Sequence, residues 1–71
     1  MSEVEVMIHA RFAPDGSVME IGERPAALTA QQWFNALSQK AATHYQALSG
    51  GRGLFRLSRA EVEALKTATA A

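Results

Sequence analysis

Three arginines in the C-terminal third of the chain, Arg52, Arg56 and Arg59, are the side chains best suited by type and spacing to bind a ligand. They belong to a block, residues 24–60, that holds five basic side chains and no acidic one. A basic surface of this kind binds anions, either nucleic-acid phosphates or the carboxylates of an acidic protein. Arg59 is also predicted at the first position of a helix, where the helix dipole disfavours a cation. We therefore take these three arginines as the candidate binding residues.

The acidic side chains offer a second interpretation of the basic block. Residues 1–23 hold five acidic side chains and one arginine, and the formal net charge of the chain is zero. The two regions can therefore neutralise each other across the fold. Nucleic-acid-binding domains are usually basic overall and carry exposed aromatic rings, whereas the aromatic residues here all fit the predicted core. Protein is thus favoured over nucleic acid as a partner.

The glycine-rich segment Ser49-Gly50-Gly51-Arg52-Gly53 is not a phosphate-binding loop. It lacks the Gly-Lys-Ser/Thr ending of such loops. It is also predicted to follow the C-terminus of a helix, where the dipole repels anions. We interpret it as a helix stop with a left-handed glycine, followed by a tight turn. The sequence predicts no cofactor.

The titratable residues predict neither catalysis nor a metal site. The chain has no cysteine and two histidines. His9 is expected on the polar face of a strand, and His44 on the apolar side of a helix, with no carboxylate near it. A grouping of serine, His44 and Asp15 has no nucleophile elbow to support it, and Asp15 is explained by a hairpin turn. We expect a protein that is not an enzyme and binds no metal.

The N-terminal half begins with a predicted hairpin. Residues 4–12 alternate strictly, with Val4, Val6, Ile8, Ala10 and Phe12 on one side, which is typical of a half-buried strand. Residues 13–17 carry the proline, aspartate and glycine of a turn. Residues 18–21 form the return strand.

The same pattern of residue types occurs in two segments, Leu28–Trp33 and Leu57–Val62, and it predicts the starts of two helices. Each combines a hydroxyl cap at Thr29 or Ser58 with a glutamine or glutamate three residues later, and so forms a capping box. The first helix is expected from about residue 30 to 48, and its apolar arc includes Trp33, Leu37, Ala41, Tyr45 and Leu48. A short strand, residues 54–57, follows. The second helix is expected to be short and to fray beyond Lys66.

The predicted fold is a single α+β domain, residues 1–71, with element order β-β-α-β-α. A three-stranded antiparallel sheet in order 2-1-3 is covered by one long helix, with a short C-terminal helix and a disordered tail at residues 67–71. The packed core is expected to join the helix arc to Val6, Ile8, Phe12, Phe55 and Leu57.

The sequence does not identify a function. We expect a small bacterial protein. We expect it to be cytoplasmic, because no signal peptide or membrane helix is recognisable. A non-catalytic interaction or accessory domain is favoured, with protein as the partner, either unknown or a second copy. Homodimerisation could use Met7 together with Met19 or Val18. The alternative is a weak nucleic-acid or anion-binding module that uses Arg52, Arg56 and Arg59.

Overall fold

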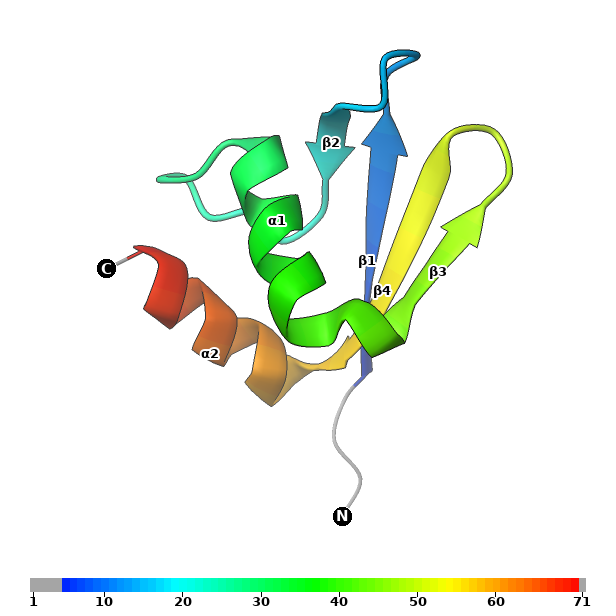
Figure 1. Cartoon of the computed structure of the whole chain (residues 1–71). Helices are drawn as coiled ribbons and strands as arrows, with labels where there is room; N and C mark the ends of the chain where they lie inside the picture. Colours follow the sequence, from blue (N-terminus) through cyan, green and yellow to red (C-terminus); the bar gives the residue numbers. More distant parts are fainter. Residues whose placement is uncertain (1–4, 71) are drawn as a thin grey trace.

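A four-stranded antiparallel sheet and two helices make up the computed structural model, which describes residues 5–70 (Figure 1). The elements are β1 (Glu5–Phe12), β2 (Val18–Ile21), α1 (Ala30–Ala41), a 3-10 turn η1 (Ala42–His44), β3 (Tyr45–Leu48), β4 (Arg52–Ser58) and α2 (Arg59–Ala70). The strand order across the sheet is β2-β1-β4-β3. Both helices contribute side chains to one core on the same face of the sheet. The α+β class predicted from the sequence is confirmed.

The predicted N-terminal hairpin is confirmed as β1 and β2. Along β1 the side chains of Val6, Ile8 and Ala10 are buried, and those between them are exposed. Val4 lies outside the described residues. In the turn, the Asp15 carboxylate accepts from the backbone N–H of Ser17 at 2.9 Å and from its hydroxyl at 2.7 Å. Side-chain bonds of this type stabilise the turn without help from the core.

The predicted first helix is too long, and the sheet gains a strand in consequence. The helix α1 ends at Ala41, and the tetrapeptide Tyr45–Leu48 forms β3, which pairs antiparallel with β4. Gly50 and Gly51 have φ values of 77° and 69°. Two consecutive left-handed residues suit the turn of a β-hairpin, so these glycines close a hairpin and do not cap a helix. The predicted order 2-1-3 holds for β2, β1 and β4, and β3 is added at the edge.

Both predicted capping boxes are present. The Thr29 hydroxyl accepts from the Gln32 N–H at 3.1 Å, and the Gln32 side chain accepts from the Thr29 N–H at 2.9 Å. Ser58 and Glu61 form the same pair of bonds, at 3.1 and 2.9 Å. These bonds satisfy backbone donors that have no partner within the helix.

The C-terminal helix is longer than predicted. Instead of fraying beyond Lys66 into a disordered tail, α2 continues to Ala70, and Ala71 lies outside the described residues. Two hydroxyls bond back to the helix, Thr67 to the Glu63 carbonyl at 3.0 Å and Thr69 to the Leu65 carbonyl at 2.7 Å. Alanine, the strongest helix former, supplies most of the other residues of this last turn.

The core joins the helices to the sheet much as the sequence predicts. The largest fully buried side chains are Trp33, Phe55, Ile8, Leu37 and Val62. Phe55 also belongs to an aromatic cluster with Phe12, Phe34 and Tyr45, whose rings pack edge-on or tilted with centroids 4.8 to 6.0 Å apart.

Two expected positions of the first helix fall outside this core, because the helix ends before them. Leu48 is half-buried on the strand β3, and His44 is exposed in η1.

Candidate functional site

The structure separates the three candidate arginines. Arg52 and Arg56 project from the strand β4, where they alternate with the buried Gly53, Phe55 and Leu57. These buried residues point to the sheet face on which the helices pack, which we call the covered face. Arg59 begins the helix α2. The three residues therefore do not form one face, and the predicted site divides into a β4 pair and a helix residue.

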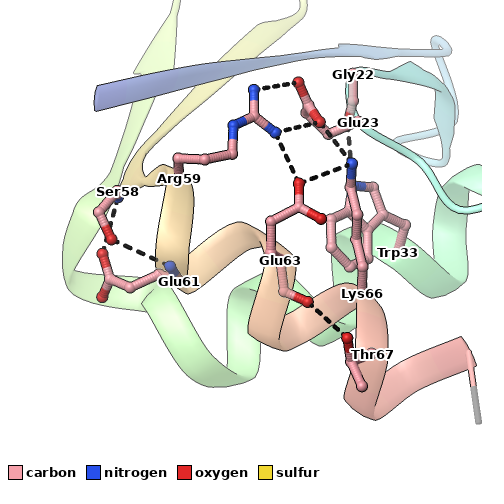
Figure 2. Close-up of polar contacts among 9 residues, drawn as sticks. All are labelled: Gly22, Glu23, Trp33, Ser58, Arg59, Glu61, Glu63, Lys66 and Thr67. Atoms are coloured by element: carbon pink, nitrogen blue, oxygen red, sulfur yellow. Dashed lines mark hydrogen bonds and ion pairs between the residues drawn. The ribbon is translucent and has the colours of Figure 1, made fainter. Parts of the chain in front are cut away.

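Arg59 is held inside an ion-pair network (Figure 2). Its guanidinium donates to both carboxylate oxygens of Glu23, at 2.9 and 3.2 Å, and to the Glu63 carboxylate at 3.0 Å. The Lys66 ammonium donates to Glu23 at 2.7 Å. Hydrogen bonds from Arg59 and then Lys66 lower the pKa of Glu23 from 4.5 to about 2. For Arg59, the expected internal charge pairing is therefore what the structure shows.

Glu23 occupies its place in this network with an unusual backbone. Its φ is 62°, in the left-handed region that non-glycine residues seldom adopt. The preceding residue, Gly22, accepts a hydrogen bond from the buried Trp33 indole at 3.0 Å. The loop between β2 and α1 is thus fixed from two sides, by Trp33 in the core and by Arg59 and Lys66 of α2. This cluster stabilises the fold and leaves Arg59 unavailable as a free cation.

The second face of the sheet carries no helix in the described chain. We call this surface the open face, and it presents the outward side chains Glu5, Met7, His9, Arg11, Glu20, Gln46, Leu48, Arg52, Leu54 and Arg56. The register of β1 and β4 places Met7 opposite Arg56, His9 opposite Leu54 and Arg11 opposite Arg52. Residues from distant parts of the sequence therefore meet in rows across the strands.

Leu54 is the apolar centre of the open face. Only 5% of the residue is exposed, yet it does not belong to the core cluster on the other side of the sheet. Its neighbours on the adjacent strands are His9 and Gln46. Met7, one row away, is 54% exposed. The open face thus combines a buried apolar centre with an exposed methionine.

Charge on the open face is only partly neutralised. Arg11 donates to Glu20 at 3.0 Å, and both side chains are exposed. Arg52 donates to the Ser49 carbonyl at 3.3 Å. Among residues 5–70, neither Arg52 nor Arg56 has a carboxylate oxygen within 4.0 Å. These two guanidinium groups keep donors free for an anionic partner.

The expected methionine patch is not continuous. Met19 is 57% exposed, but it lies at the irregularity of β2 beside Arg11 and Phe12, while Val18 is buried. Met7 lies opposite Arg56 and four residues before Arg11 on β1, which corresponds to about 13 Å at the rise of a strand. The two methionines are therefore separate features of the surface.

The titratable residues considered for catalysis do not come together. Asp15 is bonded to Ser17 in the turn after β1, while His44 lies in η1 beside a hollow of about 520 Å³ that Glu5 and Arg56 also line. These places are at opposite ends of the sheet (Figure 1). Within residues 5–70, no cluster of histidine, aspartate and glutamate side chains is suited to hold a metal ion.

Comparisons with known proteins find no relative: no family model, no curated protein and no solved structure matches the chain. A fold alone does not define a function, so the function is inferred from the geometry of the site. Within the described residues, no helix has the length and apolar character to span a bilayer.

Sequence reasoning missed His9, Arg11 and Leu54 as parts of the site. The alternation of residues 4–12 did predict that His9 and Arg11 face away from the core. What it could not give was the register that brings them beside Leu54 and Arg52. Register depends on pairing between segments more than 40 residues apart (His9 with Leu54), and no local pattern specifies it.

Proposed function

We propose that this protein is a small, non-catalytic interaction domain whose open face binds an acidic segment of another protein. The observation that carries the proposal is the pair Arg52 and Arg56, which flank Leu54 on a bare sheet face and have no carboxylate partner within 4.0 Å in residues 5–70. The proposal needs no cofactor or metal. It keeps the expectation that the protein acts in the bacterial cytoplasm.

The chemistry of the open face favours a polypeptide that carries both carboxylates and apolar side chains. Arginine forms two parallel hydrogen bonds with a carboxylate, and it is enriched in protein interfaces. Met7 supplies a flexible apolar contact beside Arg56, and methionine adapts to partners of different shape. Acidic groups that reach Arg52 and Arg56 would place an apolar side chain between them, over Leu54.

Nucleic acid is the weaker candidate for the same surface. Stacking of bases needs exposed aromatic rings, and the described aromatic residues pack on the covered face, with Trp33 and Phe55 fully buried. Arg59, the third arginine of the original hypothesis, is engaged with Glu23 and Glu63.

The test is a titration of isotope-labelled protein with a short synthetic peptide that repeats glutamate, serine, leucine and serine, so that an extended chain presents glutamate and leucine in turn on one side. We expect amide shifts in β1 and β4 around Leu54, and weaker binding as salt is added. The same peptide with glutamine in place of glutamate should cause little change. Absence of shifts at near-millimolar peptide would reject the proposal. Tighter binding of single-stranded oligothymidylate at the same amides would replace it with the nucleic-acid alternative.

Matched variants separate the open face from general charge effects. Arg52→Gln and Arg56→Gln should each weaken peptide binding about tenfold, because each removes a charge-assisted contact. Lys40→Gln removes one positive charge from α1, on the other side of the sheet, and should leave binding unchanged. Equal losses for all three variants would contradict a specific open-face site.

A further inference from the structure

The two edges of the sheet differ in how well they are protected. At the β2 edge the pairing with β1 is irregular near Arg11, and Glu20 adds a charge. The Gln31 side chain, from α1, accepts the backbone N–H of Val18 at 3.0 Å, and Asn35 in turn accepts from Gln31 at 3.0 Å. Irregular pairing, charge and cover by side chains all discourage the addition of a further strand.

The β3 edge has none of these features in the described chain. Its sequence, Tyr45-Gln46-Ala47-Leu48, contains no charged residue, no proline and no glycine. Its register with β4 runs without interruption from Tyr45 to Leu48. No described strand pairs with its outer side (Figure 1). Gln46 and Ala47 are exposed. This edge offers free backbone donors and acceptors to an added strand.

We propose that β3 pairs antiparallel with the β3 strand of a second copy, so that the sheets of the two chains become continuous. Self-pairing about a two-fold axis brings a strand against its own sequence, so a charged residue near the axis would meet its own charge. The uncharged β3 avoids that repulsion. Because the other edge is protected, each chain has one competent edge, and the assembly closes as a dimer without growing into a fibre.

The pleat of the strand limits the register of this dimer. Residues directly opposite in an antiparallel pair must point to the same face. The two-fold axis therefore lies midway between one residue and the same residue of the partner, so that this residue is paired with its own copy. With the axis at Gln46, the two Gln46 amides can bond to each other on the open face. Tyr45 then lies opposite the small Ala47 of the partner, on the covered face. We assign this register because it pairs a large side chain with a small one.

The dimer does not depend on the proposed function, although it would extend the surface on which that function rests. The β4 strands of the two copies would be separated by both β3 strands, a distance of about 14 Å at the spacing of neighbouring strands. Arg52 and Arg56 of both chains would then lie on one continuous open face. A four-residue strand provides few hydrogen bonds. We therefore expect a weak dimer, whose dissociation constant lies in the upper part of the micromolar-to-millimolar range.

The experiment is sedimentation of the wild-type chain from micromolar to near-millimolar concentration, beside two variants. We expect a monomer that converts to a dimer as concentration rises. Gln46→Lys places like charges at the axis and should weaken association at least tenfold. Gln39→Lys, the same change at an exposed position of α1, should leave it unaltered. A wild-type chain that stays monomeric throughout, or a Gln46→Lys variant that dimerises normally, overturns the proposal.

Mixing charge variants tests the register itself. Gln46→Glu alone should also be monomeric, whereas an equal mixture of Gln46→Glu and Gln46→Lys should form a heterodimer, since opposite charges now meet at the axis. Failure of the mixture to associate, with a dimeric wild type, overturns the register at Gln46. Concentration-dependent amide shifts should be confined to residues 44–48. Shifts centred on Leu54 would instead indicate a dimer through the open face and would overturn the edge pairing.

Discussion

Arg56 and Arg59 lie three residues apart in the sequence and have opposite roles in the structure. Arg59 is bonded to Glu23 and Glu63 at 2.9 to 3.2 Å and joins α2 to the loop after β2. Arg56 has no carboxylate within 4.0 Å in residues 5–70 and projects from the open face. The comparison shows that a run of basic residues is not one feature, because the chain changes from strand to helix between Arg56 and Arg59. It also separates stabilising charges from charges that remain available for a partner.

The largest expected effect tests whether stability comes from the covered face. Phe55 is fully buried on that face, and Phe55→Ala should destabilise the protein by about 3–5 kcal/mol through lost transfer energy and a cavity. Met7, on the open face, is 54% exposed, and Met7→Ala should change stability by less than about 0.5 kcal/mol. Urea denaturation measures both. A comparable loss for Met7→Ala would mean that the open face is part of the folding core.

The next effect concerns the close contact that allows β3 to join the sheet. A Cβ atom at Gly53 would collide with the Tyr45 ring, which packs against Phe55 across the strands. Gly53→Ala should therefore cost about 1–3 kcal/mol, as overpacking does. In a Tyr45→Ala background the same substitution should cost much less, because the ring that it meets is gone. Equal costs in the two backgrounds would place the strain elsewhere.

The Glu23 network predicts a smaller loss of stability in acid. Hydrogen bonds from Arg59 and Lys66 lower the folded-state pKa of Glu23 from 4.5 to about 2. A lowered folded-state pKa contributes stability that is complete above pH 4.5 and is lost as the pH falls towards 2. After allowance for solvent screening, the contribution is on the order of 1 kcal/mol. We expect Glu23→Gln to lower the melting temperature at pH 7 and to match the wild type near pH 2.

The control for that acid effect is another carboxylate. Glu20 also pairs with an arginine, but both side chains are more than 60% exposed. Glu20→Gln should therefore change the melting temperature far less than Glu23→Gln at neutral pH. A difference between wild type and Glu23→Gln that is independent of pH would contradict the assigned ion pairs.

The smallest effect is expected where the binding role is proposed. Arg52→Gln and Arg56→Gln should each change the free energy of unfolding by less than about 0.5 kcal/mol, which is usual for surface positions. Arg59→Gln removes three hydrogen bonds to Glu23 and Glu63 and should lower the melting temperature measurably. Thermal unfolding at neutral pH compares the three. If Arg56→Gln is the most destabilising, the comparison between the two arginines fails.

Local patterns predicted the parts of the fold that local chemistry determines. The alternation of β1 and the capping boxes at Thr29 and Ser58 depend only on residues close together in the sequence, and both are confirmed. The tetrapeptide Tyr45–Leu48 was assigned to a helix because a spacing of three fits a helical face, and four residues are too few to distinguish the two periods. Pairing with β4, and the space left by Gly53 for the Tyr45 ring, decide the outcome.

The candidate site could be predicted only in part, because some of its contacts join segments that are distant in the sequence. Arg52 and Arg56 were identified from their type and spacing, and the structure places them on one face. The partners of Arg59 could not be assigned, since Glu23 is 36 residues away in the sequence and reaches it from a left-handed backbone conformation. Contacts between distant segments depend on how helices and strands pack, which the spacing of residues along the chain does not contain.

The single tryptophan of the chain gives this fold an internal optical reporter. Trp33 is fully buried, and its indole N–H bonds to the carbonyl of Gly22, the residue next to Glu23. Its fluorescence emission should lie at short wavelength while the loop after β2 is docked, and should move to longer wavelength when water reaches the ring. Because Arg52 and Arg56 lie on the opposite side of the sheet, ligands of the open face can be titrated without quenching this emission directly.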